Sequence, residues 1–183
     1  MNIDAREWLE TDGLGGFASG TACLVRTRRY HGLLAVATAP PSGRVMLVNG
    51  YDAWLETDAG TINLTTQRYA PDVLHPDGVW RLDQFQPDPW PTWRWRISED
   101  VDLLHDLLMP RGTPRVLLRW RLAGRLNKAI LRVRPFVSGR EFGFSYLDRD
   151  GAFRAVRLTV DGNRATGVSR LGEYEAKLTA RRS

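Results

Sequence analysis

The alternation of apolar and charged residues constrains the fold of this chain more than any other feature of its sequence. Residues 92–97 alternate strictly, so that Trp93, Trp95 and Ile97 fall on one face and two arginines fall on the other. A period of two residues is that of a β-strand with one buried face. The same alternation recurs at 116–122, 130–134 and 156–160, and short apolar runs lie at 22–25, 33–37, 45–48 and 61–64. Because turn-forming residues separate these runs, we predict an all-β fold, an antiparallel β-sandwich with few or no helices.

The first alternating segment also predicts a hairpin with a defined register. If residues 98–100 form the loop, the facing pairs are Ile97 with Val101, Arg96 with Asp102, Trp95 with Leu103 and Trp93 with His105. Opposite charges then meet on one face and apolar groups on the other, which stabilises each pair by about 0.2–1 kcal/mol. In the next hairpin, across 110–114, a simple register places Arg119 on the tryptophan face. A bulge or a shifted loop is therefore expected there.

The arginines of the alternating segments suggest an interaction surface. If 92–97, 116–122 and 129–134 share one sheet, their arginines crowd a single face. That face is either solvated or docks onto an acidic surface. The arginines concerned are Arg94, Arg96, Arg119, Arg121, Arg132 and Arg134.

Composition excludes several classes of function. The net charge of +5 comes mostly from arginines dispersed among acids, which argues against nucleic acid as a partner. No apolar run approaches the roughly 18 residues of a membrane helix, so no membrane contact is predicted. The first residues lack the pattern of a secretory signal, and we expect a cytoplasmic location. Cys23 is the only cysteine, and we predict neither a metal nor a cofactor in the single domain of residues 1–183.

A glycine-rich stretch, Gly13-Leu14-Gly15-Gly16, stands near the start of the chain. It is not a phosphate loop, because no Gly-Lys-Ser/Thr follows, and no preceding strand makes it a dinucleotide fingerprint. Two interpretations remain. The stretch is a tight connection into a strand, or it is a loop whose backbone approaches a ligand or a partner domain.

A polar cluster, Arg29-Tyr30-His31, follows at the start of an apolar run. In a strand, Arg29 and His31 would share one face and Tyr30 would take the other. The donors of arginine and the ring nitrogens of histidine suit sugar hydroxyls. In the alternative interpretation, Tyr30 belongs to the core and Arg29 pairs with an acid such as Glu10 or Asp12.

Together these stretches carry a resemblance to a known family. The texts WLETDGLGGFASGT at 8–21 and TRRYHGLL at 27–34 resemble the opening of the bacterial and archaeal type of glycogen debranching enzyme, the amylo-α-1,6-glucosidase family. Asp12 stands where the family has Asn, and Phe17 where it has Tyr. The resemblance implies a β-sandwich of the supersandwich type that precedes a catalytic (α/α)6 helical barrel. That barrel holds the family's hydrolytic carboxylates and is absent from this sequence, so we expect the chain to be a fragment.

The resemblance also implies partners and a candidate site. The partners are an α-glucan, either glycogen or a maltooligosaccharide, and the C-terminal barrel of the same polypeptide. By analogy with two-domain glucosidases, a rim shared with the barrel would draw on Trp8, Glu10, Arg29, Tyr30 and His31. Trp90 lies in a loop stiffened by prolines, where it is a candidate for stacking on a sugar or for an inter-domain contact.

Three functions follow as alternatives. The first is a non-catalytic N-terminal domain that supports the α-1,6-glucosidase barrel and contributes to glucan binding. The second is a 4-α-glucanotransferase step on this domain itself, which would need two acids converging in a pocket. The third is a scaffolding module without glucan contact. The sequence shows no evident acid pair in a pocket, so we predict no catalytic residue here.

Overall fold

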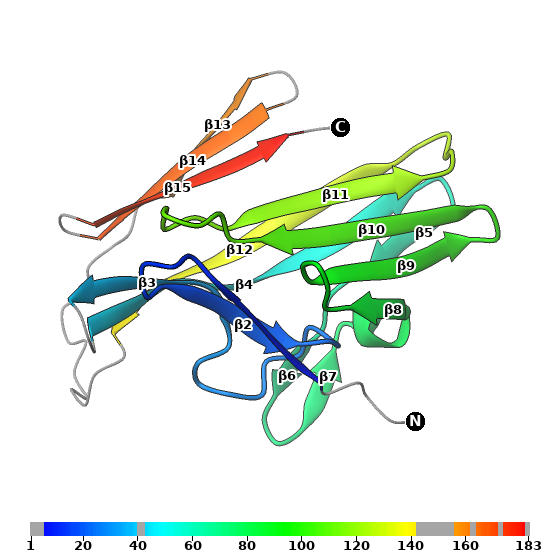
Figure 1. Ribbon diagram of the computed structural model, residues 1–183. Helices are drawn as coiled ribbons and strands as arrows, with labels where there is room; N and C mark the ends of the chain where they lie inside the picture. The colour runs from blue at the N-terminus through cyan, green and yellow to red at the C-terminus, as the bar shows by residue number, and fades with distance from the viewer. Residues whose placement is uncertain (1–5, 40–42, 142–155, 162–163, 172–173, 182–183) are drawn as a thin grey trace.

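A computed structural model describes residues 6–39, 43–141, 156–161, 164–171 and 174–181 (Figure 1). Within these ranges the chain is built from antiparallel strands and one short 3-10 helix, η1 (Asp77–Trp80). The prediction of an all-β antiparallel fold with few or no helices is therefore confirmed. No helix among the described residues has the length and apolar character that crossing a bilayer requires.

Two sheets form the body of the fold. The first has the order β1 (Glu7–Thr11), β2 (Phe17–Thr21), β3 (Gly32–Ala39), β4 (Gly43–Thr57) and β12 (Ile130–Glu141), and β5 (Gly60–Asn63) also pairs with β4. The second has the order β11 (Leu117–Ala123), β10 (Val101–Leu108), β9 (Thr92–Ser98) and β8 (Leu82–Gln86). In Figure 1 the green strands β8–β11 face the first sheet.

Two smaller sheets complete the described fold. One is the hairpin of β6 (Gln67–Tyr69) and β7 (Val73–His75). The other has the order β13 (Val156–Asp161), β14 (Arg164–Leu171) and β15 (Tyr174–Arg181). Its last strand, β15, lies beside β11 (Figure 1).

The core lies between the two large sheets. Trp93 and Trp95 on β9 have no exposed surface, and they pack with apolar residues of the first sheet such as Leu34 and Leu55. Arg96, on the opposite face of β9, is exposed. The alternation read from residues 92–97 thus orients one strand of a sandwich, with its tryptophans toward the facing sheet.

The predicted hairpin register is correct over most of its length. Arg96 lies opposite Asp102, Trp95 opposite Leu103 and Trp93 opposite His105. The expected pair of Ile97 with Val101 is wrong, because Val101 lies opposite Ser98 and the register shifts between Val101 and Asp102. The turn is therefore tighter than expected, and Ile97 is accommodated at an irregularity of the ladder.

The second hairpin keeps Arg119 away from the tryptophan face, as anticipated. Arg119 lies opposite Asp106 and donates from Nε to its carboxylate at 2.7 Å. Trp120 lies opposite His105 instead. His105 is thereby stacked between two indoles, with ring centroids 5.2 Å from Trp93 and 4.0 Å from Trp120.

The expectation of a single arginine face is wrong. Residues 130–134 belong to β12, in the other sheet, so their arginines lie apart from those of β9 and β11. The charges are also matched locally. Arg132 pairs with Glu56 and Arg134 with Asp52, both across the ladder between β12 and β4.

Candidate functional site

The glycine-rich stretch is the connection of a β-hairpin between β1 and β2. Gly13 and Gly15 have φ values of 76° and 96°, in the left-handed region that favours glycine. The Asp12 carboxylate Oδ1 accepts hydrogen bonds from the amides of Leu14 at 2.7 Å and Gly16 at 2.9 Å. A Cβ on Gly16 would lie 2.3 Å from Asp12 Oδ2 and 2.7 Å from the carbonyl oxygen of Ala35. Hairpin geometry therefore explains these glycines.

Asp12 also joins the two sheets at this end of the sandwich. Its side chain is fully buried, and its carbonyl oxygen accepts a hydrogen bond from the Gly112 amide at 2.7 Å. Gly112 lies in the connection between β10 and β11. Asp12 therefore stabilises two connections, the one between β1 and β2 and the one between β10 and β11.

The segment after β2 is a loop, where a strand was expected at 22–25. The chain turns at Leu24, whose φ of 62° is unusual for a residue with a Cβ. The Thr21 hydroxyl supports the turn by donating to the carbonyl oxygen of Val25 at 2.7 Å. β3 begins only at Gly32, so residues 22–31 form one continuous loop that joins two interior strands of the first sheet.

The cluster of Arg29, Tyr30 and His31 therefore lies in a turn and does not share strand faces as expected. The Tyr30 side chain is 54% exposed, so it is not a core residue, whereas His31 is buried. The Ser19 hydroxyl donates to the Tyr30 carbonyl oxygen at 3.0 Å and holds the turn against β2. Arg29 is exposed beside it.

The buried His31 side chain stabilises this loop through hydrogen bonds to its backbone. Its Nδ1 accepts hydrogen bonds from the amides of Thr27 at 3.2 Å and Arg28 at 3.3 Å. Its Nε2 lies 3.4 Å from a carboxylate oxygen of Glu7, which also pairs with Arg28. Burial lowers the pKa of His31 from its ordinary value, against the opposing effect of Glu7. Because an amide N–H can only donate, Nδ1 acts as the acceptor and the proton of the neutral ring is on Nε2.

The Trp8 side chain is buried in the core between the two large sheets. Its indole Nε1 donates to the carbonyl oxygen of Thr21 at 3.2 Å, and its ring meets Trp93 edge to face at 5.5 Å between centroids. Gly20 leaves the necessary space, since a Cβ there would lie 3.0 Å from the Trp8 ring. Trp8 is therefore in a position to line a cavity without being exposed itself.

Glu10 and Trp90 lie at a second place on the sandwich. Glu10 is partly buried on β1, and its pKa is raised by burial and further by the negative charge of Asp88. Asp88 is in the proline-rich connection between β8 and β9 that carries the partly buried Trp90. The six candidate residues thus form two groups, one around the loop 22–31 and one around residues 87–91.

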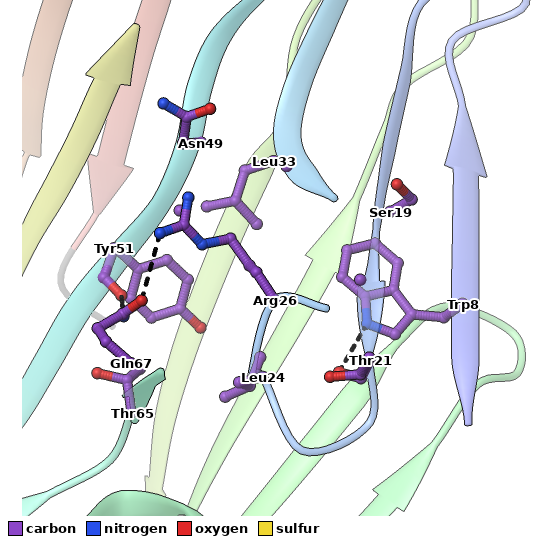
Figure 2. Close-up of a pocket in the computed structure, with 13 residues that line it drawn as sticks. Trp8, Ser19, Thr21, Leu24, Arg26, Leu33, Asn49, Tyr51, Thr65 and Gln67 are labelled. Carbon is purple, nitrogen blue, oxygen red and sulfur yellow. Dashed lines mark hydrogen bonds between the residues drawn. The ribbon is translucent and has the colours of Figure 1, made fainter. Parts of the chain in front are cut away.

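A pocket opens beside the loop 22–31, and most of its lining residues were not candidates in the sequence analysis. Its lining includes Trp8, Arg26, Asn49, Tyr51 and Gln67 (Figure 2). Arg26 comes from the loop, Asn49 and Tyr51 come from β4, and Gln67 comes from β6. In Figure 2 the Arg26 side chain extends from the loop toward Gln67, with Trp8 on the other side. With Trp8 from β1, these residues come from four segments. No local motif joins these positions, since only the fold brings the segments together.

A wider groove of about 250 Å³ borders this pocket. It shares Arg26 and Gln67 with the pocket and adds Arg68, Tyr69 and Phe136. Neither Glu10 nor Asp88 lines the pocket or the groove. The described residues that line the two hollows therefore offer aromatic rings, amides and the guanidinium groups of Arg26 and Arg68, without the paired acids that glycoside chemistry needs.

Comparison with known proteins identifies a family. The family model described as glycogen debranching enzyme N terminal matches residues 6–177. No curated protein and no solved structure matches the chain.

Proposed function

This chain belongs to the glycogen debranching enzyme N-terminal family, and we propose that it acts in the cytoplasm as a non-catalytic domain that supports an α-1,6-glucosidase barrel and contributes to binding α-glucan. The observation that carries the proposal is the match of the family model over residues 6–177. This range covers both large sheets and every residue of the candidate site. A glucan and a catalytic barrel of the same polypeptide are the partners that such a family implies.

Two aromatic residues outside the core, Tyr30 and Trp90, support a role in glucan binding. The half-exposed ring of Tyr30 lies in a turn that Ser19 holds in place, beside the exposed Arg29. Trp90 is flanked by prolines and lies two residues from Asp88, whose charge contributes to raising the pKa of Glu10. An aromatic ring with an apolar face and a polar tip suits the mixed C–H and hydroxyl surface of a sugar. We propose these two places as the rim that meets glucan or the barrel.

Native electrophoresis in gels that contain glycogen tests this proposal. We expect the migration of the chain to be retarded by glycogen, and we expect Tyr30→Ala or Trp90→Ala to reduce the retardation. Leu9→Ala is the matched control, because Leu9 is an exposed apolar residue on β1 that lines neither hollow. Migration that glycogen leaves unchanged would favour the scaffolding alternative.

A second assay addresses catalysis. The chain is incubated alone with maltooligosaccharides and the product lengths are measured. We expect no redistribution of chain lengths, because the polar groups of the two hollows include no pair of acids. Transfer of glucan segments by the chain alone would overturn the non-catalytic assignment.

A further inference from the structure

The hydroxyl of Tyr51 lacks a hydrogen-bond partner among the described residues, although the side chain is buried. The ring is fixed by edge-on contacts to His105 and Trp120, at 5.6 and 5.8 Å between centroids. Burial raises the pKa of Tyr51, which keeps the hydroxyl neutral. A buried hydroxyl without a partner is costly, so its persistence requires an explanation.

The pocket beside Tyr51 supplies that explanation. Figure 2 shows the Tyr51 ring extending from β4 toward the loop that carries Leu24 and Arg26. The pocket has a volume of about 30 Å³, which is the space of one water molecule or one hydroxyl group. A hydroxyl of a ligand that entered this space would provide Tyr51 with the missing partner.

The mouth of the pocket is lined by oriented polar groups. Arg26 Nη2 donates to Gln67 Oε1 at 3.4 Å. Gln67 Nε2 in turn donates to Asp52 Oδ1 at 3.2 Å and to the carbonyl oxygen of Tyr51 at 3.5 Å. Asn49 adds another amide side chain to the lining. These groups are arranged to exchange hydrogen bonds with a ligand that carries several hydroxyls.

The bordering groove suits a ring with an apolar face. Tyr69 is 54% exposed there, and Phe136 lies beneath Arg26, whose guanidinium carbon is 5.8 Å from the ring centroid. Near the groove Arg68 pairs with Asp72 and the neighbouring Asp52 pairs with Arg134. Arg26 donates to the Gln67 side chain. Arg26 and Gln67 thus place hydrogen-bonding groups beside the two aromatic rings, an arrangement that suits a sugar.

We propose that this groove and pocket bind one glucosyl unit of an α-glucan. The sugar ring lies against Tyr69 and Phe136, and one of its hydroxyls enters the pocket to hydrogen bond with the Tyr51 hydroxyl. Arg26 and Gln67 hydrogen bond with the hydroxyls at the mouth. The inference rests on the proposed function, because it names the place on the domain where the glucan binds, separate from Tyr30 and Trp90.

Tyr51→Phe tests the inference because it removes only the side-chain hydroxyl and keeps the ring. We expect the affinity of the chain for maltoheptaose, measured by isothermal titration, to fall about three- to tenfold, the effect of one neutral hydrogen bond. We also expect the melting temperature without ligand to stay unchanged or to rise, because no described residue hydrogen bonds with the hydroxyl. A purely structural hydroxyl would give the opposite pattern, a lower melting temperature with unchanged affinity.

Gln67→Ala is the second variant, and Gln84→Ala is its matched control. Gln84 is an exposed glutamine on β8 that lines neither hollow. We expect Gln67→Ala to weaken maltoheptaose binding and Gln84→Ala to leave it unchanged. In the wild-type chain, maltoheptaose should shift the side-chain amide NMR signals of Asn49 and Gln67.

The outcomes separate this inference from the proposed function. If glycogen retards the wild-type chain but Tyr51→Phe and Gln67→Ala bind maltoheptaose as the wild type does, the groove assignment is wrong and the proposed function stands. If the wild-type chain binds neither glycogen nor maltoheptaose, both are wrong.

Discussion

We predict that His105 makes the free energy of unfolding depend on pH, and that the substitution His105→Phe removes this dependence. The ring is fully buried between Trp93 and Trp120, and burial lowers its pKa from 6.5 to about 4. The carbonyl of Arg119 and the charge of Asp106 oppose this shift only in part. Because the pKa in the folded state lies below that of the unfolded chain, protonation favours unfolding. The contribution of neutral His105 is complete above pH 6.5 and is lost as the pH falls toward 4.

The magnitude follows from the two pKa values. At 1.36 kcal/mol per pH unit, a change from 6.5 to about 4 removes about 3 kcal/mol from the free energy of unfolding. His105→Phe retains a planar ring for stacking but does not titrate. It also loses the contact of Nδ1, 3.2 Å from the Arg119 carbonyl oxygen, so we expect the variant to be about 1 kcal/mol less stable at pH 7.5.

Urea unfolding followed by tryptophan fluorescence at several pH values measures the effect. Between pH 7.5 and 4, we expect the wild type to lose about 3 kcal/mol more than His105→Phe, so that the variant becomes the more stable protein in acid. The acids with shifted pKa values are present in both proteins, and their contributions largely cancel in the comparison. Parallel curves for the two proteins would refute the reasoning, because they would mean that burial does not suppress protonation of His105.

Three further predictions concern the connections at the site, each measured by chemical unfolding unless stated otherwise. Asp12→Asn should raise the free energy of unfolding by about 1 kcal/mol, because Oδ1 still accepts from two amides while Oδ2, which has no partner among the described residues, is replaced. Asp12→Ala should lower the free energy of unfolding by about 2–3 kcal/mol, because both hydrogen bonds are lost. A lower free energy of unfolding in both variants would contradict this prediction. Gly16→Ala should lower the free energy of unfolding by about 3 kcal/mol, because its Cβ would clash with Asp12 and Ala35. Gly13→Ala should lower it by only about 1 kcal/mol, because no atom lies close to the new Cβ. Equal losses in the two variants would show that the steric clash does not determine the effect. His31→Ala should cost about 2 kcal/mol and speed amide hydrogen exchange at Thr27 and Arg28, and unchanged exchange there would exclude the role of Nδ1.

The sequence predicts local features of this fold better than distant ones. The register of β9 on β10 follows from the alternation around Trp93 and Trp95, because side-chain period and cross-strand pairing are set within a few residues. The place of β12 in the other sheet depends on its pairing with β4, far away in the sequence. Alternation orients a strand without choosing its neighbour, so the expected arginine face was wrong.

The candidate site shows the same limit. The family text locates Tyr30 and His31, but a strand interpretation missed the loop of residues 22–31, in which Tyr30 is exposed and His31 is buried. The pocket residues Tyr51 and Gln67 belong to no motif, and only the tertiary fold brings them together. That the buried Tyr51 hydroxyl has no partner among the described residues is a result of packing, which no local pattern encodes.

Co-sedimentation of the 183-residue chain with glycogen tests the central claim most directly. The domain is mixed with increasing glycogen, the polysaccharide is pelleted, and the protein in each fraction is measured. The account predicts that the pelleted fraction rises with glycogen and falls again when maltoheptaose is added. A chain that stays in the supernatant at every glycogen concentration would contradict it.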